Sequence, residues 1–356
     1  MSGQQLGVIA TGAVTAVGLS SAQTCAAIRS GISAVAQSDF VLQTADWERV
    51  LAASVPMRPR ASACRPAARL CALARLALQE CFAALADGGH AAGADARRIA
   101  LLVGVPEPAR LERFDRWFGQ DVRQVLLQQL LGPFHPSSEI LPHGNVSAFV
   151  GLHKARELIA AGVVEACIVG GVDSLLNSAD LDALEGGWRL HREGEGNGLV
   201  PGEAAAFVAV TRRDAANGTR PLATIAGLGI DREPAETAQA QGGHPTGQGM
   251  VRALKAATAD AGVAESVVGL RVTDLNGERY RAMDSMLTVS RFYRTDRDGL
   301  PICHPAECIG ETGAAVGAVL IQVACQGIVR GYAPVSAVMC ETSCHDGLRG
   351  TCLVLA

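Results

Sequence analysis

Short apolar runs alternate with Ala-rich, helix-like patterns along most of the chain. The runs that predict strands cover residues 6–10, 99–103, 205–210, 222–229 and 269–275. The patterns that predict helices cover residues 21–30, 67–85 and 247–261. Residues 105–140 are rich in Arg, Gln and Pro and show neither pattern, so we expect an irregular segment that wraps the surface or a partner. The alternation of strands and helices predicts an α/β fold.

One supersecondary unit occurs twice. From Gly144 the chain reads GNVSAFVGLHKARELIAAGVVEACIVGGVDS, which predicts a sharp turn, a helix that ends at Gly162, a buried strand through Cys167 and a Gly-Gly turn. From Gly310 it reads GETGAAVGAVLIQVACQGIVRGYAPVSAVMCETS, and the same plan is repeated. The repeat predicts two duplicated halves, which we place at residues 1–215 and 216–356. We expect a site where the N-termini of the two helices meet.

Composition narrows the classes of protein that the chain can represent. Its 356 residues are 49% hydrophobic, enough for a large core, and a net charge of −4 gives no footprint for nucleic acid or a membrane surface. The first residues lack the pattern of a signal peptide, and the weakly polar stretch 312–329 contains Gln322 and Gln326, which favours a core helix over a membrane span. The 11 cysteines show no C-x-x-C spacing, which predicts mostly buried thiols in a cytoplasmic protein.

Several segments resemble known motifs in their order and spacing. They are GVIATGAVTAVG from Gly7, a helix end at Arg29-Ser30-Gly31-Ile32, LVPGEAAAFVAV from Leu199, PTGQGMVRALKAATADAGV from Pro245, and a helix start at Gly313-Ala314-Ala315. Together they resemble the β-ketoacyl synthases of the thiolase superfamily over nearly the whole chain. The resemblance implies a thiolase-like, five-layered αβαβα fold and usually a dimer. It also implies an active site with a Cys nucleophile, two His, a Lys and a Gly-Phe-Gly loop.

The positions that match the catalytic residues carry other side chains. The nucleophile falls on Asn145, at a helix start where the helix dipole would lower the pKa of a thiol, and an amide cannot attack a thioester. The first His falls on Asn276 and the second on Gly310, although a longer gap would bring in His304. The Lys falls near Pro305. We therefore expect none of the usual catalytic residues, and no cofactor.

Two further segments bear on this vestigial pocket. The Gly-Phe-Gly loop is replaced by Cys344-His345-Asp346-Gly347, which contains a thiol, a base and a carboxylate. Because adjacent residues rarely point at one another, a polar turn is the simpler interpretation. The run 279–284 places bulky, charged residues where the family has small ones, and we expect them to fill the pocket.

Other side chains were weighed against plainer roles. His143 could reach the pocket or lie in a solvated turn, and Ser147 more simply supports the helix start. A set of ligand-type side chains occurs within a short span, but its spacing matches no standard zinc pattern, and a loop without metal is the simpler interpretation. This set comprises Cys303, His304, Cys308 and Glu311.

Three functions remain open from the sequence. The first is a non-catalytic, chain-length-factor-like partner of an active β-ketoacyl synthase in fatty acid or polyketide biosynthesis, as a heterodimer, with acyl carrier protein as a further partner. The second is an adaptor or chaperone-like protein, for example beside a bacterial secretion effector, and either this or the first could be a homodimer. The third is an acyltransferase that uses a relocated thiol such as Cys344. An open acyl tunnel would favour the first function, and a shallow, blocked pocket the second.

Overall fold

The structure is a computed structural model in which residues 5–42, 48–88, 95–192, 194–214, 220–332 and 337–356 are described. Its ten main strands form one mixed sheet in the order β10-β9-β11-β12-β8-β1-β7-β6-β4-β5. Within the described residues the strands are β1 (Leu6–Thr15), β4 (Ile99–Gly104), β5 (Glu139–Leu141), β6 (Ala166–Ser174), β7 (Glu203–Arg212), β8 (Ala223–Arg232), β9 (Leu270–Thr273), β10 (Ile302–Cys303), β11 (Ala337–Ser343) and β12 (Leu348–Leu355). A separate hairpin pairs β2 (Val35–Val41) with β3 (Arg49–Ala53).

The two halves of the sheet repeat one topology. In the first half β5, β4 and β6 run parallel, and β7 and β1 follow as antiparallel strands. In the second half β10, β9 and β11 run parallel, and β12 and β8 follow as antiparallel strands. The halves join through a short antiparallel pairing of residues 6–8 with residues 223–225. The boundary expected at residues 215 and 216 lies outside the described residues, so its exact place stays a prediction.

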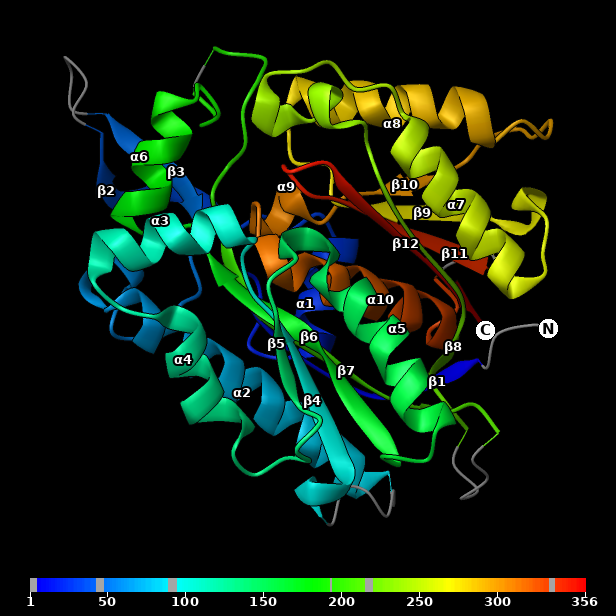
Figure 1. Ribbon diagram of the computed structural model, residues 1–356. Coiled ribbons are helices and arrows are strands. Elements are labelled where there is room, and N and C mark those ends of the chain that lie inside the picture. The colour runs from blue at the N-terminus through cyan, green and yellow to red at the C-terminus, as the bar shows by residue number, and fades with distance from the viewer. Residues whose placement is uncertain (1–4, 43–47, 89–94, 193, 215–219, 333–336) are drawn as a thin grey trace.

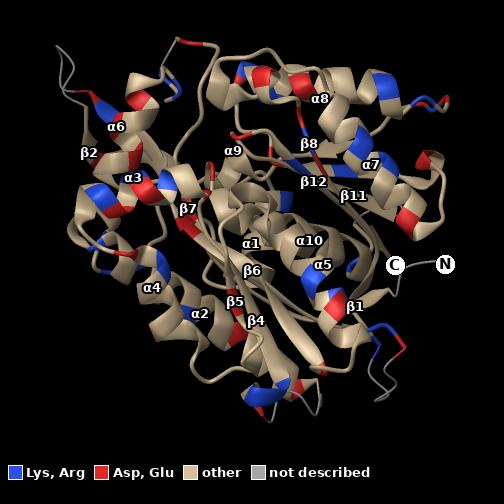
Figure 2. Cartoon of the chain, in the orientation of Figure 1, with Lys and Arg blue, Asp and Glu red and all other residues tan. Residues whose placement is uncertain are grey.

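Two helices fill the space between the halves (Figure 1). They are α5 (Ser147–Ala160) and α10 (Val316–Val329), and each contacts strands of both halves. The outer face of the first half is covered by α2 (Pro66–Asp87), and that of the second half by α7 (Gln248–Ala261), which packs beside α8 (Arg279–Phe292). Helix α10 contains no charged residue (Figure 2), as expected for a helix that is buried on all sides except in its last turn. The layers run helix, sheet, helix, sheet, helix, which confirms the expected thiolase-like α/β fold.

The Gly-Gly turn expected after Cys167 is not a turn. Gly170 and Gly171 lie inside β6, which runs on to Ser174. A Cβ on Gly170 would lie 2.0 Å from the Ala206 carbonyl oxygen, and one on Gly171 would lie 2.1 Å from the Ala314 carbonyl oxygen. The glycines therefore allow close backbone approach within the sheet and at the start of the central helix.

The expectation of an irregular segment at 105–140 is also wrong. The segment contains α3 (Pro108–Phe118), α4 (Val122–Leu126), a π-helical turn (Leu127–Leu131) and β5. The polar composition of the segment concealed its helices from the pattern analysis, although α3 has ordinary boundary signals. It has Pro108 in its first turn and ends at Gly119, which has a φ of 62°. The remaining helices are α1 (Ser21–Arg29), α6 (Ser178–Gly186) and α9 (Ala306–Ile309). No helix in the described part of the chain is long and apolar enough to cross a membrane.

Candidate functional site

The N-terminal ends of α5 and α10 meet between the two halves. Each helix is preceded by a short 3-10 turn, Gly144–Val146 before α5 and Gly313–Ala315 before α10, and these turns contact one another. Gly144 and Gly313 have positive φ values of 52° and 49°, which a side chain would strain. At Gly313 a Cβ would also lie 1.9 Å from a carboxylate oxygen of Asp173. The duplicated pattern had predicted a site at this junction.

Asn145 is buried at this junction, and its side-chain NH2 group donates to two carboxylates. The Nδ2 atom donates to Asp274 Oδ2 at 3.0 Å and to Glu311 Oε1 at 3.1 Å. Ser147, two residues later, accepts a hydrogen bond from the His143 backbone N–H and donates to the Leu141 carbonyl oxygen at 3.0 Å. Ser147 is thus tied to the backbone around the helix start.

One carboxylate connects Asn145 and Asn276, two residues that we expected at catalytic positions. Asn276 donates from Nδ2 to Glu311 Oε2 at 2.6 Å, while the other oxygen of Glu311 accepts from Asn145. Glu311 also accepts the backbone N–H of Gly313 at 3.0 Å. Gly310 itself offers no side chain, and a Cβ there would lie 2.8 Å from the Val200 carbonyl oxygen. Glu311, the residue after the expected second His position, therefore connects Asn145, Asn276 and the turn at Gly313.

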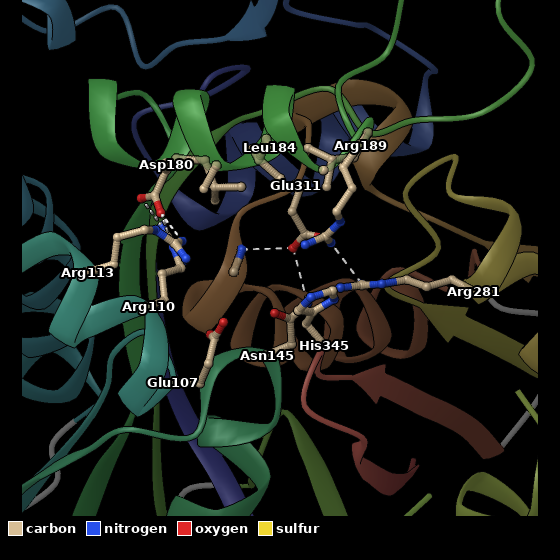
Figure 3. A pocket seen from close by; sticks show the side chains of 15 residues that line it. Glu107, Arg110, Arg113, Asn145, Asp180, Leu184, Arg189, Arg281, Glu311 and His345 are labelled. Atoms are coloured by element: carbon tan, nitrogen blue, oxygen red, sulfur yellow. Dashed lines mark hydrogen bonds and ion pairs between the residues drawn. The ribbon is translucent and has the colours of Figure 1, made fainter. Parts of the chain in front are cut away.

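Arg281 supplies the positive charge in this network (Figure 3). Its Nη1 lies 2.9 Å from Asp274 Oδ2 and 3.1 Å from Glu311 Oε2, and the side chain is buried. Arg281 lies on α8, within the run 279–284 that we expected to fill the pocket. Burial, opposed by Arg281 and reinforced by Glu311, raises the pKa of Asp274 to about 6. Burial also opposes ionisation of Glu278, but the bidentate contact with Arg189 outweighs it and lowers the pKa of Glu278 to about 2.

A second buried ion cluster faces this network from helix α3. Arg110 on α3 contacts both oxygens of Asp173 at 2.7 and 2.8 Å and both oxygens of Asp180 at 2.8 Å. Asp173 also accepts the backbone N–H of Ala314 at 2.9 Å, so a carboxylate already occupies the N-terminal end of the second central helix. Arg113 adds a further contact to Asp180 at 3.0 Å.

These two clusters enclose a small, charged cavity of about 190 Å³. Figure 3 shows side chains from α3, α6 and α8, together with Asn145 and Glu311, converging on it. Ligand pockets for drug-sized molecules usually hold about 300–1,000 Å³ and are mostly apolar. The lining includes Glu107, Arg110, Arg113, Asn145, Asp180, Arg189, Arg281, Glu311 and His345. Such a wall suits neither an acyl chain nor its thioester.

The Cys344 turn does not form a nucleophile and base pair. Burial, with Glu107 and Asp346 nearby, raises the pKa of the Cys344 thiol well above its ordinary value. His345 lines the cavity instead, where burial and the neighbouring Arg189 lower its pKa to about 3. Asp346 pairs with Arg232 at 3.0 Å. Among the described residues, no hydrogen bond joins the thiol to the imidazole.

The other candidates lie apart from this network. His143 is half-buried outside the cavity lining, and Pro305 is buried where α9 begins. His304 contacts Glu307 at 2.6 Å, and Cys303 and Cys308 line a separate cavity. Since Glu311 points to the asparagines, the four possible metal ligands do not converge. Within the described ranges, no group of three or more His, Cys, Asp or Glu residues could hold a metal ion.

Sequence reasoning missed most of the ionic groups. Arg110 lies in the segment expected to be irregular, and Asp173 lies in the part of β6 expected to be a turn. The only available signal for Asp173 was an acidic residue at the end of a buried apolar strand, close to a helix start.

The chain matches known proteins in structure and not in sequence. No family model and no curated protein sequence matches the chain. Solved structures do. A structure of a type II polyketide synthase acyl-carrier protein in complex with its ketosynthase bound to the hexaketide matches with a TM-score of 0.81 at 14% identity, over 99% of both chains. The chain has the thiolase-like ketosynthase fold.

Two further structures agree with this assignment. A ketosynthase in complex with its chain length factor from Xenorhabdus doucetiae gives a TM-score of 0.79 at 16% identity, over 99% of this chain and 98% of that chain. A β-ketoacyl synthase from Burkholderia phymatum gives 0.72 at 20% identity, over 99% of both chains. Identities this low establish the fold and leave the activity to be argued from the site.

Proposed function

We propose that this chain is a non-catalytic ketosynthase-fold protein that works by assembling with a catalytically active ketosynthase. The observation that carries the proposal is the carboxylate of Glu311, which accepts hydrogen bonds from both Asn145 and Asn276 inside a buried network. These residues match the positions of the family's nucleophile and first His. Support for the partner comes from the fold, because similar structures include a ketosynthase in complex with its chain length factor.

The site lacks the groups that condensation needs. Thioester chemistry requires a nucleophile that is activated by a neighbouring base or by a lowered pKa, and donors aimed at the developing oxyanion. Here both asparagine amides donate to carboxylates, and Arg281 is held by Asp274 and Glu311. Binding without a reacting group gives no turnover. The chain is expected to act through its surface.

A pull-down with the tagged full chain from its native lysate tests the partner. We expect a co-purifying protein that has the ketosynthase fold and retains the catalytic Cys and both His residues. Strand β5 is an edge of the sheet, it contacts the π-helical turn 127–131, and Leu127 there is 46% exposed. A sheet edge is a natural pairing surface, and an acidic side chain beside it should weaken pairing, so Leu127→Asp should reduce recovery of the partner about tenfold or more, the factor that a loss of about 1.4 kcal/mol produces.

The matched control for this variant is Val267→Asp. Val267 is 43% exposed, but it lies in a short 3-10 helix (Glu265–Val267) of the second half, away from β5. Recovery of the partner should be unchanged in this variant. Recovery without any Cys-containing ketosynthase, under conditions in which the tagged chain itself is folded, would reject the proposal.

One observation favours a second candidate, an adaptor or chaperone-like protein. The cavity beside Asn145 is small and charged, so within this chain it is no acyl tunnel that could measure a growing product. A protein that keeps the fold and lacks the tunnel suits binding to a partner outside acyl chemistry. The same pull-down separates the two candidates, since an adaptor would recover a protein of another class.

The third candidate, an acyltransferase that uses Cys344, predicts a covalent adduct. We expect none, because burial and nearby carboxylates disfavour the thiolate that would attack a thioester. Intact-protein mass spectrometry after incubation with acyl carrier protein thioesters of several chain lengths should show an unmodified mass. An acyl adduct that disappears in Cys344→Ser would restore this candidate.

A further inference from the structure

A second cavity lies at the C-terminal end of α10, and no described residue lines both this cavity and the charged one. Its volume is about 430 Å³, within the usual range for small-molecule sites. Helix α1, strand β10, helix α9 and the last turns of α10 contribute its walls. Along α10 the cavities are roughly 20 Å apart, from Gly313 to Gln326, whereas Cys308 of this cavity precedes Glu311 of the charged cavity by three residues.

The walls of this cavity are mostly apolar. Ala22 and Ala26 are one helical turn apart on α1 and leave space above the helix, and Ile28, Leu270, Ile302 and Val323 complete the apolar lining. Three cysteines also line it, Cys25, Cys303 and Cys308. Burial raises the pKa of Cys303 to about 11 and that of Cys25 to about 12, so these thiols are neutral and behave as small apolar groups.

Two arginines, Arg29 and Arg330, lie at the rim. Arg29 and Arg330 both line the cavity and are exposed, and among the described residues neither forms an ion pair. The guanidinium of Arg29 lies 3.6 Å from the centre of the Tyr332 ring, which holds it in place through a cation–π contact. The acidic residue of the lining, Glu307, lies on α9 and is already bonded to His304 at 2.6 Å. The two arginines outnumber the one acidic residue of the lining, so the rim carries net positive charge beside an apolar space.

We propose that this cavity binds a free aliphatic carboxylate of medium chain length. The alkyl chain of the ligand would lie against the alanines of α1 and Val323 of α10, and its carboxylate would accept hydrogen bonds from Arg29 and Arg330. An apolar wall alone would accept a neutral alkyl chain equally well, whereas the parallel N–H donors of a guanidinium group select a planar anion. This site needs neither the partner nor the vestigial site, so it goes beyond the proposed function and can fail independently of it.

Titration calorimetry of the full chain with octanoate and with 1-octanol tests the proposal. Octanoate should bind at least about tenfold more tightly than the alcohol, since charge-assisted hydrogen bonds are about twice as strong as neutral ones. The double variant Arg29→Gln, Arg330→Gln should abolish this preference, and Ala26→Trp should prevent both ligands from binding by filling the space. Arg116→Gln, which removes an exposed arginine of α3 outside the lining, should bind as the wild type does.

Three results would overturn the proposal. Equal affinity for octanoate and 1-octanol would remove the anion preference. Octanoate binding that Ala26→Trp leaves unchanged would place the ligand elsewhere. Self-association of the wild type that Ala26→Trp abolishes, with no octanoate binding, would identify the cavity as a contact with a second copy of the chain. The substituted residues are exposed, and matching urea unfolding curves confirm that each variant is folded.

Discussion

Replacement of Glu311 by leucine is expected to lower the free energy of unfolding by about 3–5 kcal/mol, the range for breaking a buried ion pair by removing one partner. The variant leaves the amides of Asn145 and Asn276 and the N–H of Gly313 without this acceptor, and it removes one of the carboxylates around Arg281. Leucine is similar in size, so the loss reflects missing polar contacts more than a void. Urea unfolding at neutral pH measures this loss of unfolding free energy.

Two comparison variants separate this effect from a general loss of charge. Glu307 precedes Glu311 by four residues and its side chain is 73% exposed, so Glu307→Leu should change the stability by no more than about 0.5 kcal/mol. Glu311→Gln keeps an oxygen acceptor and should fall between the two. A Glu311→Leu protein that is as stable as the Glu307→Leu protein would mean that the network contributes nothing to the fold.

The pattern of apolar residues predicted the frame of the molecule well. The repeated unit placed two helices whose N-terminal ends meet, and the structure has α5 and α10 in that arrangement. Such a pattern is local, because helix and strand periodicity depends on neighbours a few residues away. The same argument failed at Gly170 and Gly171, where glycine allows a close approach to β7 and to the turn before α10 that no local pattern records.

The contents of the site could be predicted only in part. Matching the motifs identified Asn145 and Asn276 as residues of interest, and their assignment to the nucleophile and His positions stays a prediction. Glu311 had been grouped with Cys303, His304 and Cys308 because they are close in sequence. Its actual partners lie 35 and 166 positions away, at Asn276 and Asn145. Side chains that meet across such separations depend on the complete fold.

A further buried ion pair, Glu203 with Arg69, lies in a motif that resembles the family. Glu203 begins β7 within the LVPGEAAAFVAV motif, and both of its carboxylate oxygens bond to Arg69 on α2, at 2.6 and 3.1 Å. Arg69 also donates to the carbonyl oxygens of Val55, Met57 and Pro59. The motif that resembles the family therefore anchors a loop and an outer helix to the sheet. This structural role is independent of whether the site between the halves is catalytic.

The change Arg69→Met should accordingly cost about 3–5 kcal/mol, because it leaves the Glu203 carboxylate buried without its ion partner. Arg69 is 2% exposed and Glu203 is 0% exposed, so water cannot replace the guanidinium without opening the structure. Arg69→Lys should recover only part of the loss, since an ammonium cannot reproduce the bidentate contact and the three carbonyl contacts together. Urea unfolding of both variants measures the difference.

The control is Arg65→Met, which changes an arginine four residues earlier in the sequence. Arg65 is exposed at the N-cap of α2, and its loss should change the stability by no more than about 0.5 kcal/mol. The double variant Arg69→Met, Glu203→Gln removes the unpaired charge as well. Its loss of unfolding free energy should therefore be smaller than the sum of the losses in the single variants Arg69→Met and Glu203→Gln. Strict additivity in this cycle would show that Arg69 stabilises the loop through its carbonyl contacts alone and that the charge of Glu203 needs no partner.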